Sequence, residues 1–355
     1  MHLTLHIGTE KTGTTSIQNF LSINRALLGE NGVIVPRSLG GTNQRLLAGI
    51  AMNDDHVDDL FQSAGLTDDE ARHTAKADWF SQFRRELDAK ADGADMVLIS
   101  SEHLHSRLSR DGEIERLHEL LSPLFESITV VVYLREPIAT AVSAYSTAVK
   151  YGAIGANIPP PDRPYFFNLV NHARTTRRWS GVFGDDALRV RLFEPDALLG
   201  GEAISDFIET AKLPQLNYAM PLRSNPSLDA LGVELLRRVN KDIPRFVDAE
   251  PNPLREGLIE FFEKHFSDGS PIAAPAKIVA AYEETFADSN AFIHQTYFPE
   301  RNQLFTPYSK AAERPHPGHV KDYDAVASAL TSLWRAKQEA MSQSALPNAK
   351  ARRTR

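Results

Sequence analysis

The chain has 355 residues, of which 42% are hydrophobic and 24% are charged, and this is ordinary globular usage that argues against a disordered, collagen-like or coiled-coil chain. Lysine and arginine number 39 against 46 aspartates and glutamates, so the net charge is −7. This balance does not favour broad nucleic-acid binding, because phosphate contacts need clustered cations. The sequence has no cysteine, which excludes disulfides, cysteine nucleophiles and thiolate metal sites.

The sequence predicts neither a targeting segment nor a membrane-spanning helix. No apolar run approaches the roughly 18 residues that a membrane helix needs. The first residues lead directly into a glycine loop, without the apolar core of a signal peptide. We therefore expect a soluble, cytoplasmic protein that does not span a membrane.

The N-terminal segment predicts a strand, a loop and a helix in succession. Leu3, Leu5 and Ile7 alternate with polar residues, which is typical of a strand. Glycines and small hydroxyl residues follow over 8–16, and an apolar helical pattern starts at Ile17. This succession is the first unit of an open α/β sheet.

Later elements repeat the alternation of strand and helix. Strands are predicted over 33–35, 96–99, 128–134 and 188–193, with helices over 76–90, 113–124, 136–150 and 202–211. Strand signals fade after about residue 225, and helices are predicted over 227–241, 254–266, 275–286 and 321–343. We expect an α/β fold with a central, mostly parallel sheet flanked by helices and a helical C-terminal layer. One α/β domain over 1–310 and a C-terminal helix with a basic tail over 311–355 are the expected divisions.

Two long connecting segments, and a shorter stretch within each of them, differ from the rest in length or composition. Residues 53–70 carry seven acidic side chains without lysine or arginine, which indicates a solvated face or, alternatively, a selector against anionic acceptors. The proline-rich segment 158–164 predicts a stiff, extended connection. The long irregular connections 36–75 and 151–180 are expected to shape the pocket for a substrate.

The loop after the first strand has the chemistry of an anion site. Lys11 supplies a positive charge, and backbone N–H groups at the start of the next helix attract anions. The surrounding residues that would join this site are Thr12, Gly13, Thr14, Thr15 and Ser16. The alternative is a simple helix cap with additional threonines. A Walker A loop places lysine directly after its last glycine, whereas Lys11 stands two residues before Gly13.

This loop resembles the 5′-phosphosulfate loop of sulfotransferases, in the form found in bacterial members. The resemblance implies a modified P-loop fold and the co-substrate 3′-phosphoadenosine 5′-phosphosulfate, abbreviated PAPS. A second motif has Arg135 at the end of the strongest strand and Ser143 eight positions further on. It looks like the family's 3′-phosphate site, where an arginine and a serine at that spacing hold the ribose phosphate. The Arg-Lys-Gly of eukaryotic members is missing, and Arg223 is the substitute that we expect to complete the site.

The third strand is expected to supply the catalytic base. Glu102 and His103 follow it, at the strand end where the sites of α/β proteins gather. Family members place a glutamate or a histidine near this point. We favour Glu102 over His103, because Ser100 and Glu102 would share a side if the strand continued through them.

The resulting hypothesis is a PAPS-dependent sulfotransferase that transfers a sulfuryl group to a hydroxyl or amine and needs no metal. The acceptor is left open among a carbohydrate, a lipid headgroup, a small molecule such as a phenol, and a peptide. The alternatives are a P-loop kinase or nucleotide hydrolase, and an inactive nucleotide-binding regulator. His103 and His105 could be metal ligands, but no third ligand is evident. The Gly-x-Ser-x-Gly of serine hydrolases is absent from the sequence.

Overall fold

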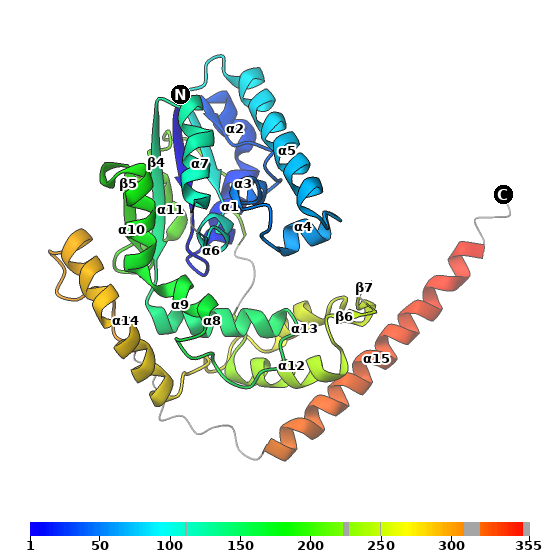
Figure 1. Cartoon of the computed structure of the whole chain (residues 1–355). Coiled ribbons are helices and arrows are strands. Elements are labelled where there is room, and N and C mark those ends of the chain that lie inside the picture. Colours follow the sequence, from blue (N-terminus) through cyan, green and yellow to red (C-terminus); the bar gives the residue numbers. More distant parts are fainter. Residues whose placement is uncertain (111, 223–226, 249, 309–319, 351–355) are drawn as a thin grey trace. The chain divides into compact units, whose positions relative to one another are not determined.

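The computed structural model describes residues 1–110, 112–222, 227–248, 250–308 and 320–350 (Figure 1). The chain divides into two compact units. The first consists of Met1–Thr140, Pro161–Arg223 and Ala281–Pro307, and the second of Ala141–Pro160, Ser224–Ala280 and Tyr308–Arg355. The helices α8 (Pro137–Lys150) and α14 (Ala276–Tyr297) each contribute to both units.

A five-stranded sheet forms the centre of the first unit, with the strand order β2-β3-β1-β4-β5. The strands are β1 (His2–His6), β2 (Val33–Ile34), β3 (Met96–Ser100), β4 (Ser127–Leu134) and β5 (Leu188–Leu192). Each neighbouring pair is parallel. The predicted α/β fold with a parallel sheet is therefore confirmed.

Helices cover both faces of this sheet. One face carries α1 (Thr14–Ile23), α2 (Arg25–Glu30) and α11 (Ala203–Thr210). The other carries α3 (Arg45–Ala51), α4 (Asp59–Ser63), α5 (Asp69–Lys90), α6 (His103–Arg107), α7 (Glu113–Leu121) and α10 (His172–Phe183). The α9 helix (Pro164–Val170) precedes α10, and 3-10 turns lie at Ser122–Leu124, Asp185–Ala187 and Leu199–Gly201.

The side chains of β1 point alternately to the two faces of the sheet, so this strand contributes to the hydrophobic clusters on both faces. Leu3 and Leu5 pack into the cluster beneath α3, α5 and α7. His6 points to the opposite face, where its ring lies 5.1 Å from that of Phe207 in α11. Both sets are fully buried, as a central parallel strand requires.

The second unit is mainly helical, as the fading of strand signals predicts. Its elements include α12 (Ala230–Asp242), α13 (Leu258–His265), α15 (Val320–Lys350), a 3-10 turn at Pro253–Arg255 and a small hairpin of β6 (Phe246–Val247) and β7 (Glu250–Pro251). Trp334 of α15 donates its indole N–H to the carbonyl oxygen of Leu254 at 2.6 Å.

Two sequence-based expectations need correction. The connections 36–75 and 151–180 contain the helices α3, α4, α9 and α10 and the start of α5, so they are not simply irregular. Periodicity misses α10 because its buried face includes His172, Thr175 and Thr176 beside Trp179. The acidic segment is not only a solvated face, since the buried carboxylate of Asp58 contacts Arg45 and Arg107.

The topology places the first loop at a switch point of the sheet. The chain leaves β1 toward α1 on one face, whereas it leaves β3 toward α6 on the opposite face. Such divergence opens a crevice beyond the carboxyl ends of adjacent parallel strands. The loops that follow β1, β3 and β4 therefore meet at one end of the sheet.

Candidate functional site

The loop between β1 and α1 forms a tight turn at the start of the helix. Lys11 has a left-handed backbone with φ 69°, and Gly13, at the N-cap of α1, has φ 77°. Within the described part of the chain, no side chain caps this helix. The N–H groups of the first turn and the positive end of the helix dipole therefore face the turn that contains Lys11, an arrangement that attracts anions.

The hydroxyl groups of the loop divide into two sets. Thr12 is buried and donates its hydroxyl to the carbonyl oxygen of Thr9 at 2.5 Å, so it stabilises the turn itself. Thr14 is also buried, whereas Thr15 and Ser16 are exposed. Only the latter two present their side chains to solvent, and these are the hydroxyls suited to a bound anion.

Glu102 lies directly against this loop. A Cβ atom at Gly8 would stand 3.0 Å from Cβ of Glu102, so the absence of a side chain at Gly8 permits the close approach. Oε2 of Glu102 accepts hydrogen bonds from Nε2 of Gln18 at 2.6 Å and from Nδ2 of Asn43 at 3.1 Å. The carboxylate is thus held in place by two amides, one from α1 and one from the segment before α3.

Gln18 and Asn43 are site residues that the sequence reasoning missed. Gln18 is buried on the apolar face of α1 beside Ile17 and Leu21. A polar residue on an apolar helix face is a usable sequence signal, because such a side chain needs a hydrogen-bond partner. Asn43 lies in a turn and gives no comparable signal.

Ser100 and Glu102 do not share one side of a strand, contrary to the expectation from the sequence. β3 ends at Ser100, and α6 begins at His103. The backbone turns between them, so strand alternation does not decide which neighbour faces the loop. His103 has its pKa lowered by burial, an effect that the negative charge of Glu102 opposes. Its Nδ1 atom is buried without a hydrogen-bond partner among the described residues.

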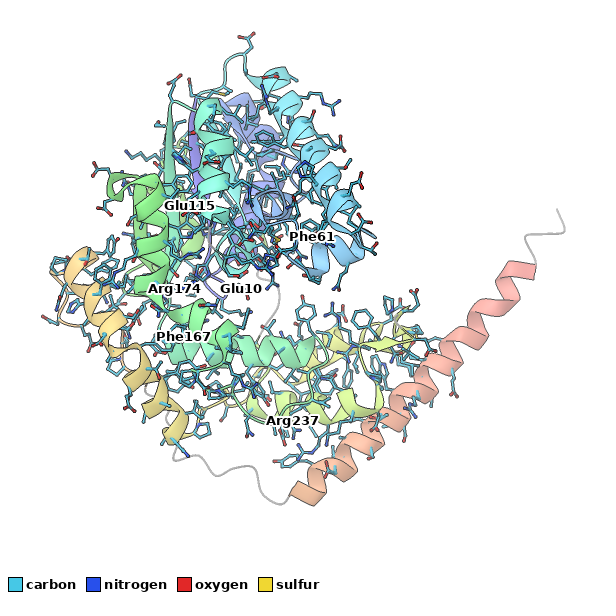
Figure 2. The ribbon with its side chains drawn as sticks, viewed as in Figure 1. Glu10, Phe61, Glu115, Phe167, Arg174 and Arg237 are labelled. Carbon is cyan, nitrogen blue, oxygen red and sulfur yellow. The ribbon has the colours of Figure 1, made fainter. Side chains whose placement is uncertain are left out.

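A tyrosine from α9 also reaches the loop. Tyr165 donates its hydroxyl to the carboxylate of Glu10, the residue before Lys11. Burial and the charge of Glu10 both raise the pKa of the Tyr165 phenol, which keeps it protonated as the donor. Figure 2 labels Glu10 together with Phe167 of α9. The segment after the proline-rich connection thus contacts the loop through a side chain that the sequence did not single out.

Arg135 follows β4 and contacts the backbone of the loop. Its Nη1 atom donates to the carbonyl oxygen of Lys11 at 3.0 Å, and its guanidinium lies 5.7 Å from the ring centroid of Phe193. Ser143 belongs to α8 within the second compact unit. The joint role of Arg135 and Ser143 therefore stays a prediction, and Arg223 lies outside the described residues.

The described ranges contain no candidate metal site and no candidate membrane-spanning helix. There, no three or more histidine, aspartate or glutamate side chains come together in an arrangement that could hold a metal ion. His105 is instead buried and hydrogen-bonded through Nε2 to Oγ1 of Thr175 at 2.9 Å. No helix in those ranges is long and apolar enough to cross a membrane.

Three buried histidines around the site predict a loss of stability in acid. Burial lowers the pKa of His6 and His105 to about 3 and that of His172 to about 4. Below the unfolded value of about 6.5, the unfolded chain binds protons that the folded state excludes. Each histidine's contribution to the free energy of unfolding is therefore complete above that pH. It falls by up to about 1.4 kcal/mol per pH unit as the pH decreases.

The measurement is the free energy of unfolding by urea from pH 7 to pH 5, for the wild type and His6→Asn. Asparagine keeps a polar group near Nδ1, which contacts Oγ of Ser100 at 2.8 Å, but it does not titrate. We expect a flatter pH dependence in the variant, even if it is less stable at pH 7. The same slope in both proteins would contradict a buried, neutral His6.

Among the comparisons with known proteins, similarity is found to solved structures. No family model matches the chain, and no curated protein matches it. The structure is similar to a crystal structure of a sulfotransferase from Alicyclobacillus acidocaldarius, with a TM-score of 0.38 and 16% sequence identity, covering 80% of this chain and 95% of that chain.

Proposed function

We propose that the protein is a sulfotransferase that uses PAPS and transfers its sulfuryl group in line to a hydroxyl or amine of an acceptor. The observation that carries this proposal is the arrangement around Lys11. A lysine with a left-handed backbone lies beside a helix N-terminus that no described side chain caps, and Arg135 holds this turn through a hydrogen bond to the carbonyl oxygen of Lys11. Such a turn suits the 5′-phosphosulfate group, because donors fixed in advance stabilise charge without reorganisation.

The proposed reaction has one displacement step at sulfur. The acceptor oxygen or nitrogen attacks the sulfur atom, and the bond between sulfur and the 5′-phosphate oxygen breaks. The electron pair of that bond goes to the phosphate oxygen, whose charge Lys11 and the first-turn N–H groups of α1 stabilise. The acceptor proton goes to Glu102, with His103 as the alternative base. Adenosine 3′,5′-bisphosphate is released, and no metal ion is invoked.

Glu102 suits the role of base for a geometric reason. Its two amide partners both contact Oε2. Neither of these two hydrogen bonds involves Oε1, so it is the oxygen that we assign to the acceptor proton. The contact between Gly8 and Glu102 brings this carboxylate beside the turn where the sulfuryl donor is proposed to bind.

The test of the proposal is the preference for a 3′-phosphate. Arg135 and Ser143 are proposed to bind this group, with Arg223 as a third contact. A charged hydrogen bond contributes roughly 1.5–3 kcal/mol, so its loss weakens binding by about tenfold or more. We expect adenosine 3′,5′-bisphosphate to bind at least that much more tightly than AMP in calorimetry. Arg135→Ala should reduce this preference.

Arg177→Ala is the matched control. The guanidinium of Arg177 also lies over a phenylalanine ring, at 4.0 Å from the centroid of Phe292, but no role in the site is proposed for it. The Arg177→Ala variant should bind adenosine 3′,5′-bisphosphate and AMP with wild-type affinities. Equal wild-type affinities for the bisphosphate and AMP would contradict the proposed function. A requirement for magnesium and a triphosphate would favour a kinase or nucleotide hydrolase.

A further inference from the structure

His172 occupies a fully buried position at the first residue of α10. Its Nε2 atom lies 2.8 Å from the carbonyl oxygen of Arg135, and its side chain is 1% exposed. A carbonyl oxygen only accepts, so Nε2 must carry the proton and donate. The other ring nitrogen, Nδ1, is buried without a hydrogen-bond partner among the described residues.

This position does not otherwise favour a histidine. The ring packs 5.7 Å from that of Phe305, in surroundings where an apolar side chain would fit. A buried nitrogen without a partner is unfavourable, and an apolar residue would avoid that cost. Burial lowers the pKa of His172 to about 4, so the ring is neutral near pH 7. The bond to Arg135 is the interaction that accounts for an imidazole here.

The bond fixes the backbone at the point where β4 passes into α8. The preceding residue, Leu134, is already held by the sheet, since its carbonyl oxygen accepts from the N–H of Phe193 at 2.7 Å. At Arg135 the strand has ended, and His172 binds the carbonyl oxygen of that residue. The side chain of Arg135 then donates to the carbonyl oxygen of Lys11. A continuous chain of two hydrogen bonds joins α10 to the Lys11 turn.

We propose that His172 is a positioning residue that orients Arg135 and, through Arg135, stabilises the left-handed turn at Lys11. The effect on nucleotide binding rests on the proposed function, whereas the effect on the turn does not. His172 would contact neither the nucleotide nor the acceptor. Its role is to reduce the freedom of an arginine that must meet a phosphate in one orientation.

The test compares a donor-free variant with one that retains a donor. His172→Leu removes the N–H at similar volume, and His172→Gln places an amide N–H near the position of Nε2. His172→Phe is a second donor-free variant if leucine does not fold. His105→Leu is the matched control, because His105 is also buried, neutral and bonded through Nε2, but its partner is Thr175.

Two measurements separate positioning from general stability. The first is amide hydrogen exchange of residues 9–13 in the protein without nucleotide. The second is the ratio of affinities for adenosine 3′,5′-bisphosphate and AMP. A typical hydrogen bond corresponds to about a five- to tenfold change in an equilibrium. We expect His172→Leu to accelerate exchange and lower the ratio by about that factor, and His172→Gln to restore both.

The control decides the outcome. His105→Leu should lower the melting temperature as much as His172→Leu and leave both measurements near the wild type. Unchanged loop exchange in His172→Leu, or an equal change in His105→Leu, overturns the inference. If the wild type itself shows no preference for the 3′-phosphate, the proposed function fails, and loop exchange alone decides the role of His172.

Discussion

Lys11→Ala is expected to reduce sulfuryl transfer by on the order of 100-fold or more, with little change in the melting temperature. The side chain would neutralise the leaving phosphate oxygen at the moment when its charge develops. Alanine and lysine experience the same backbone strain at φ 69°, so the substitution removes the ammonium group without changing the turn's conformational cost. Turnover with labelled PAPS and thermal unfolding, measured on the same preparation, check this result.

Lys212→Ala is the matched control for this substitution. Lys212 is exposed and also has a left-handed backbone, with φ 52°, but it follows α11 away from the loop. The Lys212→Ala variant should have the turnover of the wild type. Lys11→Gly also removes the ammonium group, and it does so in a turn that no longer carries the strain of a Cβ atom at positive φ. A folded Lys11→Ala variant with near-normal turnover would remove Lys11 from the mechanism.

Glu102→Gln is expected to lower sulfuryl transfer by about 100-fold to 10,000-fold, the usual contribution of a general base. The fold should survive for a specific reason. The remaining amide oxygen can accept from Gln18 and Asn43 as Oε2 does, leaving the NH₂ group at the position of Oε1. The affinity for adenosine 3′,5′-bisphosphate should barely change, because a phosphate is not bound by a carboxylate.

His103→Asn is the comparison that assigns the base. The lowered pKa of His103 leaves its imidazole neutral near pH 7, so the residue has the protonation state that a base requires. We expect its loss to reduce transfer less than Glu102→Gln does. The reverse ranking, in folded proteins with normal nucleotide affinity, would assign the base to His103.

The sequence by itself determined the parallel sheet and the position of the glycine-rich loop that is proposed to bind an anion. Strands such as β4 have a local signature, since a continuous β-branched run is specific to a buried parallel strand. The turn at Gly8–Gly13 was equally readable, because glycines and a lysine between a strand and a helix are adjacent in the chain. Local patterns of this kind depend on a few neighbouring residues, and no distant contact is needed to interpret them.

Tertiary structure alone decided how the site is held together. Gln18 and Asn43 fix Glu102 across 84 and 59 residues of chain, and Arg135 meets Lys11 across 124. The end of β3 at Ser100 also changed the relation of Glu102 to His103, since the backbone turns into α6 at that point. These features depend on which strand ends become neighbours in the sheet. That order is set by packing between distant segments, so no periodicity within one segment contains it.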